Sequence, residues 1–242
     1  MSRFCLVSVD LQLDFFDPDS EVGKLEKALC LPGVRHLIDH ARANGRQIFH
    51  VATVHEESAS MPLHLVKRNL PLYCSKDTDG AASIDGLVGG TDRRITKTKF
   101  SGFFETTLAD EIAEYDSLIL CGIATDCCVL ATALDAASHG KHLYVPYQAV
   151  SASSLRTYLS GLEAIAKSAG AVVDLAAVLG QQGELWETRL PEDREMTQAE
   201  EWYKGEEQRL ADFRKRQAAS PTRPAQALVA LLEEYLAGGD AP

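Results

Sequence analysis

The sequence predicts an α/β protein: a doubly wound, mostly parallel sheet of six strands with helices on both faces. Short apolar runs alternate along the chain with longer stretches whose apolar residues recur at helical spacing. This alternation is typical of βαβ units. Residues 117–123, SLILCGI, are almost continuously apolar, as expected of a strand buried on both faces. Several helical stretches also stop at a glycine, such as Gly45 and Gly140.

The strands are expected where short apolar runs occur. They are residues 4–9, 47–54, 117–123, 141–150 and 171–175, and residues 93–97 form a weaker, strand-like segment. The helices are expected at residues 33–44, 106–115, 126–140 and 153–170. Residues 106–115 begin with threonines and carry acidic residues in their first turn, which suits a helix N-terminus.

The composition changes after residue 180, where the chain becomes dense in charge. We therefore expect one α/β domain over residues 1–180 and a charged helical extension over residues 181–242. Trp202, Leu210 and Phe213 lie at roughly helical spacing in the extension, and residues 225–239 form a short amphipathic pattern. Charged faces are usually solvated. We thus expect the extension to pack on the core or on a partner subunit, rather than to act as a lid over a pocket.

Composition and charge exclude several classes of partner. Hydrophobic residues make up 45% of the 242 residues, enough for a sizeable core. The net charge of −11 predicts an acidic surface that repels phosphate backbones and anionic lipid headgroups. We expect no nucleic-acid or membrane partner. The N-terminal run reads as a strand rather than a signal peptide, and the six cysteines show no zinc-ligand spacing. A cytoplasmic protein with reduced thiols is expected.

Reactive side chains follow three of the predicted strands. Asp10 closes the first strand, Lys97 closes the third, and Cys127 and Cys128 start the helix after the fourth. Ligands of doubly wound sheets bind at the carboxyl ends of the strands. A thiol at a helix N-terminus has a lowered pKa, and the free N–H groups there can hold an oxyanion. An aspartate can move the proton, and a lysine can stabilise negative charge. Each residue alone also has a structural interpretation, as a turn cap, a surface charge or a packed thiol.

Three ordered motifs resemble one family. They are LVSVDLQLDFF (6–16), ITKTKFSGFFETTL (95–108) and GIATDCCVLATALDAASHG (122–140). Over roughly residues 4–180 the chain is similar to the isochorismatase-like cysteine hydrolases, which include nicotinamidases and N-carbamoylsarcosine amidase. The resemblance implies that residues 1–180 are an isochorismatase-like hydrolase domain with the family's Rossmann-like fold. It does not cover the residues after 180.

The resemblance implies a catalytic triad of Asp10, Lys97 and Cys128. The family's nucleophile directly precedes V-x-x-T, which is the position of Cys128, while Cys127 falls on a variable position. Lys99 lies two residues beyond Lys97, so spacing alone does not exclude it, but the motif favours Lys97.

The resemblance also implies an oxyanion hole. In this family a cis peptide precedes the alanine of G-V-A-T, which corresponds to the Ile123–Ala124 bond. The N–H groups of Ala124 and Cys128 would then face the oxyanion.

One departure from the family concerns metal. Nicotinamidases hold a metal with D-x-H and a later histidine, and here Thr53 stands where the aspartate is expected. His55 and His64 fit the histidines, and Glu56 or Glu57 could substitute with a different geometry. A divalent ion would lose its anionic ligand. We therefore predict no metal and no cofactor.

The resulting hypothesis is a cysteine hydrolase that cleaves a C–N bond of a small molecule through a thioester. Amides, carbamoyl compounds, ureido acids and lactams are the substrate classes that the resemblance implies, without a choice among them. Phe15, His55, Phe103 and Phe104 are candidate substrate contacts. The alternatives are a nicotinamidase with an altered metal site and a non-catalytic thiol-sensing or binding module. The resemblance further implies a homo-oligomer of unspecified size.

Overall fold

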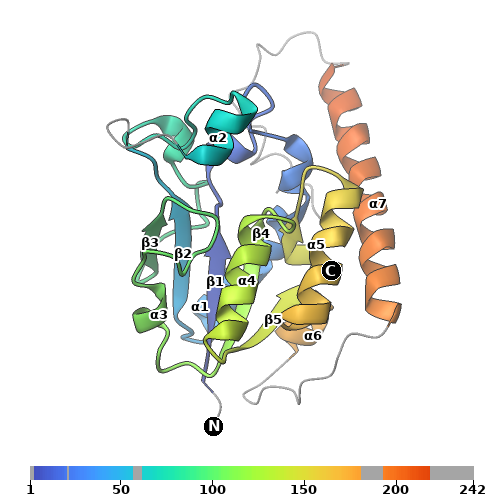
Figure 1. Cartoon of the computed structure of the whole chain (residues 1–242). Coiled ribbons are helices and arrows are strands. Elements are labelled where there is room, and N and C mark those ends of the chain that lie inside the picture. The colour runs from blue at the N-terminus through green and yellow to red at the C-terminus, as the bar shows by residue number, and fades with distance from the viewer. Residues whose placement is uncertain (1–2, 21, 57–61, 181–192, 219–242) are drawn as a thin grey trace.

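The computed structural model describes residues 3–20, 22–56, 62–180 and 193–218 (Figure 1). Its centre is a sheet in the order β3-β2-β1-β4-β5-β7, with β6 paired to the end of β4. The strands are β1 (Phe4–Val9), β2 (Ile48–Thr53), β3 (Arg93–Lys97), β4 (Ser117–Ile123), β5 (His142–Pro146), β6 (Val150–Ser151) and β7 (Ala171–Val173). All of these strand pairs are parallel. The predicted α/β class and parallel sheet are confirmed.

The predicted strand over residues 141–150 is wrong in one respect, because it is two strands. β5 ends at Pro146, a 3₁₀ turn covers Tyr147–Ala149, and the chain resumes as β6. Proline has no N–H to donate to a neighbouring strand, so the ladder is interrupted there. The sheet therefore has seven strands rather than six.

Helices cover both faces of the sheet, as predicted. In Figure 1, α4 (Cys128–Ser138) and α5 (Leu155–Ser168) lie in front of the strands, and α1 (Leu31–Ala43) lies behind them. Three short helices, α2 (Leu63–Arg68), α3 (Leu108–Glu111) and α6 (Leu175–Leu179), complete the main domain.

The helix predicted over residues 106–115 is largely absent. Only α3 (Leu108–Glu111) is helical, a single turn. The Lys141 ammonium donates to the backbone carbonyls of Ile112, Ala113 and Tyr115, which turns these groups away from a continuing helix. This contact joins residues distant in sequence, so local propensity did not reveal it.

The extension contributes one long helix, α7 (Asp193–Ala218), which runs beside α5 at the edge of the molecule (Figure 1). Tyr203 is fully buried, and its ring lies 4.6 Å from that of Tyr158 on α5. Leu210 and Phe213 are buried as well. In this structure α7 therefore packs on the core. The helical pattern at residues 225–239 lies outside the described residues.

Within the described ranges, no helix has both the length and the apolar character needed to cross a bilayer.

Two glycines let backbones approach closely near the carboxyl ends of the strands. Gly122 has a φ of +109°, and a Cβ there would lie 2.1 Å from the Val9 carbonyl oxygen. A Cβ at Gly161 on α5 would lie 2.4 Å from the carbonyl oxygen of Thr125. These approaches fix the loop between β4 and α4 against β1 on one side and α5 on the other.

We predict opposite effects of the same substitution at two helical glycines. Gly161→Ala should lower the free energy of unfolding by about 1–3 kcal/mol, because its methyl group meets backbone that cannot yield easily. Gly205→Ala on α7, where a Cβ meets nothing within 4 Å, should raise it by about 0.5–1 kcal/mol. Urea unfolding of both variants measures the difference, and equal effects would contradict the close packing of α5 on the loop.

Candidate active site

The site lies where the strand order reverses, between β1 and β4. Asp10 directly follows β1, and Cys128 is the first residue of α4, which follows β4. Register keeps the two strand ends level, since Val9 pairs with Gly122. Asp10 and Cys128 both line a cavity of about 370 Å³ at this edge of the sheet. The topology thus brings together two residues that are far apart in the chain.

Lys97 connects these two residues. Its Nζ lies 2.9 Å from Asp10 Oδ2 and 3.4 Å from Cys128 Sγ. It also donates to Thr53 Oγ1 at 2.7 Å and to the backbone carbonyl of Lys99 at 3.1 Å. Lys97 and Asp10 are nearly inaccessible to solvent. The three residues predicted as a triad are therefore in contact through one ammonium group.

Lys99 does not compete for this position. β3 ends at Lys97, and the Lys99 side chain is exposed. Of the two lysines that spacing left open, only Lys97 contacts Asp10.

Thr53 completes this hydrogen-bond network. From the sequence, its position was of interest only as that of a missing metal ligand. It is opposite Lys97 in the β2–β3 register. Its backbone N–H and its hydroxyl both donate to Asp10 Oδ1, at 3.0 and 2.9 Å. Gln12 holds the Thr53 backbone in turn, accepting from its N–H at 2.8 Å and donating to its carbonyl at 2.7 Å. Only the strand register could have revealed this arrangement.

The backbone at Asp10 supports the same geometry. Asp10 has a φ of +55°, in the left-handed region, where aspartate is among the few tolerated side chains. Its N–H donates to the Val51 carbonyl at 2.8 Å, which ties the turn to β2. Unusual backbone of this kind clusters at functional sites.

The charge state of Cys128 depends on the neighbouring thiol of Cys127, on burial, and on the charges of Asp10 and Lys97. A hydrogen bond with Cys127, burial and the carboxylate of Asp10 raise the pKa of the Cys128 thiol, and Lys97 only partly opposes them. The same thiol–thiol hydrogen bond lowers the pKa of Cys127. The expectation of a lowered pKa for Cys128 was therefore wrong, because the hydrogen bond with Cys127, burial and the Asp10 carboxylate raise it. At neutral pH Cys128 holds its proton, so a base is needed to remove it.

Lys97 remains an ammonium ion in this setting. Burial lowers its pKa, but Asp10 and Cys128 outweigh burial through charge and hydrogen bonding, and the net effect is a raised pKa. A fixed positive charge is thus held between the carboxylate and the sulfur.

Ala124, the other residue expected to supply an oxyanion donor, lines the same cavity as Cys128. The Ile123–Ala124 peptide bond is cis, as the resemblance implies. Thr125 anchors the following residues, since its N–H and hydroxyl each donate to the Ser151 carbonyl at 2.9 Å. Within the part of the chain that the structure describes, the N–H groups of Ala124 and Cys128 have no protein acceptor.

Only some of the predicted contact residues reach the cavity. Phe15 lines it, together with Tyr73 and Phe100, which the sequence analysis did not single out. Phe103 and Phe104 do not line it, which corrects the prediction. The Phe103 ring stacks on His139 at 4.9 Å, at the far end of α4, and Phe104 is 52% exposed.

The two histidines lie against one tyrosine. His55 is buried and does not line the cavity; its ring lies 5.3 Å from that of Tyr73, and its Nε2 has no hydrogen-bond partner among the described residues. His64 lines the cavity, and its Nε2 lies 3.2 Å from the Tyr73 hydroxyl. Burial lowers the pKa of both rings.

This donor set does not fit a metal site. Zinc takes at least three protein ligands. Across the described residues, no three His, Cys, Asp or Glu side chains converge in this way. Thr53 is engaged by Asp10 and Lys97, and Glu57 lies outside the described residues. The absence of a metal stays a prediction.

Cations also line the cavity, and sequence reasoning missed them. Lys27 is buried, whereas Lys24 and Arg68 are exposed at the cavity wall. None of these three cations belongs to a recognisable sequence motif. Lys24 and Lys27 are far from Arg68 in the sequence, and the fold brings all three to the same cavity.

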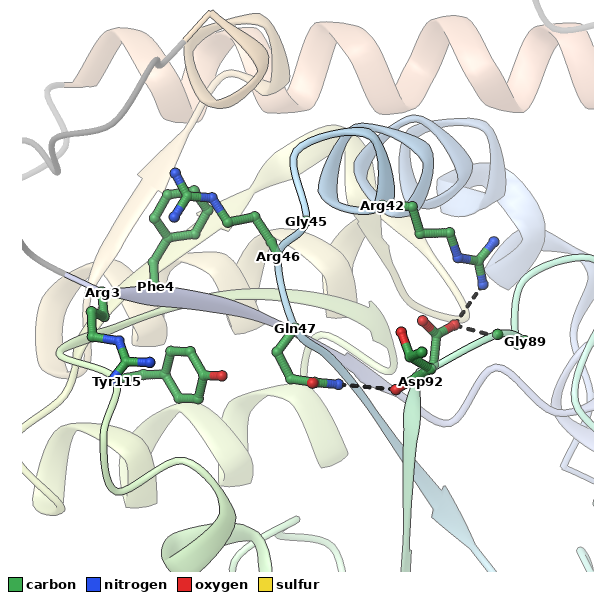
Figure 2. A pocket seen from close by; sticks show the side chains of 11 residues that line it. Arg3, Phe4, Arg42, Gly45, Arg46, Gln47, Gly89, Asp92 and Tyr115 are labelled. Atoms are coloured by element: carbon green, nitrogen blue, oxygen red, sulfur yellow. Dashed lines mark hydrogen bonds and ion pairs between the residues drawn. The ribbon is translucent and has the colours of Figure 1, made fainter.

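A larger cavity of about 520 Å³ lies at the opposite, amino edge of the sheet (Figure 2). Its arginines are already engaged: Arg42 pairs with Asp92, and Arg46 lies over the Phe4 ring. It contains none of the predicted reactive residues. Asp10 and Cys128 line the smaller cavity instead, so cavity size does not follow the predicted reactive residues.

Comparisons with known proteins agree with this geometry. The family model described as the isochorismatase domain matches residues 4–177. A probable inactive nicotinamidase of Arabidopsis thaliana is 28% identical over 142 residues, covering 54% of this chain and 71% of that protein. Streptothricin hydrolase of Streptomyces noursei is 27% identical over 146 residues, covering 60% and 52%. The crystal structure of Pyrococcus horikoshii pyrazinamidase in complex with zinc has a TM-score of 0.64 and 27% identity, covering 71% of this chain and 99% of that chain.

The hydrogen bonds of Thr53 generate a stability prediction. Thr53→Val keeps the volume but removes the hydroxyl that serves two buried charges, and should cost about 3 kcal/mol of unfolding free energy. Thr53→Ser keeps the hydroxyl, loses one methyl group and should cost about 1 kcal/mol. Urea denaturation ranks the two variants. A valine variant as stable as the serine variant would refute the network.

Proposed function

Because the chain belongs to the isochorismatase family, we propose that it is a cysteine hydrolase that cleaves a C–N bond of a small molecule. One observation carries the proposal: the Lys97 ammonium contacts both the Asp10 carboxylate and the Cys128 sulfur at the wall of a cavity. A nucleophile, a proton acceptor and a fixed positive charge are what thioester chemistry at a carbonyl requires.

In the first half of the reaction, Asp10 takes the proton of the Cys128 thiol as the sulfur attacks the substrate carbonyl carbon. The carbonyl oxygen becomes an oxyanion, which the N–H groups of Ala124 and Cys128 stabilise. Asp10 then passes its proton to the leaving nitrogen, the C–N bond breaks, and ammonia or an amine departs. The acyl group remains on sulfur as a thioester.

In the second half, a water molecule attacks the thioester carbon while Asp10 takes one of its protons. The C–S bond breaks, the sulfur takes the proton back from Asp10, and an acid is released. Lys97 stays charged throughout. It stabilises the thiolate and keeps Asp10 oriented, with Thr53 fixing the other carboxylate oxygen.

The relatives support an amide-type substrate. Two of them are named as a pyrazinamidase and as streptothricin hydrolase, and we extend this C–N hydrolase class to the present chain. The nicotinamidase alternative is less favoured, since the described residues supply no metal-ligand set. The cytoplasmic location and homo-oligomeric state stay predictions from the sequence.

We predict that the protein releases ammonia or an amine from members of a panel of amide, carbamoyl, ureido and lactam compounds. Cys128→Ala should lower the rate by about 10³-fold or more, because it removes the nucleophile. Lys97→Met should lower it by about 10²-fold or more, because it removes the fixed charge. Lys99→Met is the matched control and should stay within a few-fold of the wild type, since its side chain is exposed. Coupled assay of ammonia, with amine detection by mass spectrometry, measures all four proteins.

Two results would contradict the proposal. Turnover that survives in Cys128→Ala would exclude the thioester route. Absence of turnover across the panel, together with no acylated Cys128 in mass spectra of the incubated protein, would favour the non-catalytic alternative.

A further inference from the structure

Lys27 is a buried cation in the cavity wall that the mechanism does not use. It lies on the 3₁₀ helix η2 (Leu25–Cys30), and only 7% of its surface is exposed. Its Nζ donates to the Val22 carbonyl at 2.7 Å and lies 5.4 Å from the centre of the Phe15 ring, which also lines the cavity. Among the described residues, no carboxylate forms an ion pair with it. Its other two N–H donors have no anionic partner there.

A buried charge without a counter-charge is costly. Burial lowers the pKa of Lys27, and interactions with Cys128, Cys127, Asp126 and Asp10 in their anionic forms oppose that effect. Lys27 and Cys128 line the same cavity, so the two side chains face a common space. A perturbed charge of this kind in a cleft is typical of a ligand contact.

The remaining charges of the cavity favour an anionic ligand. Lys24 and Arg68 add two cations at the wall. On the acidic side, Asp10 is already paired with Lys97, and Asp126 is exposed. With three cations at its wall, this cavity differs in charge from the chain as a whole, whose net charge is −11.

We propose that Lys27 binds a carboxylate of the substrate, so that the site takes amide, carbamoyl or ureido compounds that carry an acid group. The inference rests on the proposed function for the reaction and adds the substrate class. A single ammonium with two available donors suits a carboxylate. In a cavity of about 370 Å³, the carboxylate and the scissile carbonyl belong to one small molecule.

The C-terminal extension supports the segment that carries Lys27. Arg214 on α7 pairs with Glu26, the residue before Lys27, at 3.1 Å. Ser151 on β6 donates to the Glu26 carbonyl at 3.0 Å. η2 is thus held from one side by the sheet and from the other by a helix beyond the region that the family model matches. Arg214 and Ser151 are positioning residues for Lys27.

Two alkylating reagents of similar size test the anionic subsite without knowledge of the substrate. Iodoacetate carries a carboxylate and iodoacetamide a neutral amide; both form an S–C bond at a thiolate and release iodide. Mass spectrometry of the peptide containing Cys127 and Cys128 gives the two rates. In Lys27→Met, the ratio of the iodoacetate rate to the iodoacetamide rate should fall about tenfold relative to the wild type. Lys167→Met, which removes an exposed charge on α5, should leave the ratio unchanged.

A ratio that is equal in the wild type and Lys27→Met would overturn the proposal. So would failure of both reagents to modify these cysteines, because the cavity would then be closed to a small carboxylate. Thermal unfolding of Lys27→Met shows whether the fold is intact, and Lys27→Arg, which keeps the charge, should retain part of the preference.

Turnover gives the second measurement. For matched ureido acids and their carboxamides, Lys27→Met should raise KM for the acid about tenfold and leave kcat and the carboxamide nearly unchanged. An equal loss of kcat on both compounds would instead assign Lys27 to stabilising the reacting atoms. An iodoacetate preference without any turnover would leave the anionic subsite standing and remove the proposed reaction.

Discussion

The buried Lys97 ammonium is the interaction on which the arrangement of this site depends. A charge removed from water must be surrounded by acceptors, and here these come from four separate segments: Asp10 after β1, Thr53 at the end of β2, the carbonyl of Lys99, and the sulfur of Cys128 on α4. The contacts of these acceptors with the single Lys97 ammonium therefore fix the relative positions of three strand ends and one helix. The same requirement explains why Thr53 and Gln12, which do not line the cavity, belong to the site in structural terms.

The sheet order makes this convergence possible. Residues 10, 97 and 128 are widely separated in the chain, but parallel strands end at one edge, and the reversal of strand order between β1 and β4 leaves space there for a ligand. Close backbone packing at Gly122 and Gly161 then holds the loop that carries Ala124. In the proposed reaction, donors that are fixed in this way would need little reorganisation when charge develops on the carbonyl oxygen.

Much of the fold and the central part of the site could be predicted from the sequence, because both depend on local pattern. The strand-like segment at 93–97 and the apolar run at 117–123 became β3 and β4 with the expected bounds, and Asp10 and Lys97 at the strand ends came into contact as expected. What depended on distant contacts could not be predicted. Lys141 ends the helical turn at α3, and Phe103 turns toward His139.

The direction of the pKa shift at Cys128 follows from burial and from a hydrogen bond with the neighbouring thiol, neither of which the sequence displays. Lys27 stands in no motif, and its burial appears only when η2 is folded against β6 and α7.

The salt bridge between Arg214 and Glu26 has a consequence for how this protein could diversify. Lys97, beside the sulfur, is held by three strand ends and by the first residue of α4, whereas the segment that carries Lys27 is held by β6 and also by the appended helix α7. The appendage thus contributes directly to the support of Lys27. Under the proposed function, changes that accumulate in the appendage would alter the ligand accepted at Lys27 and leave the contacts among Asp10, Lys97 and Cys128 in place.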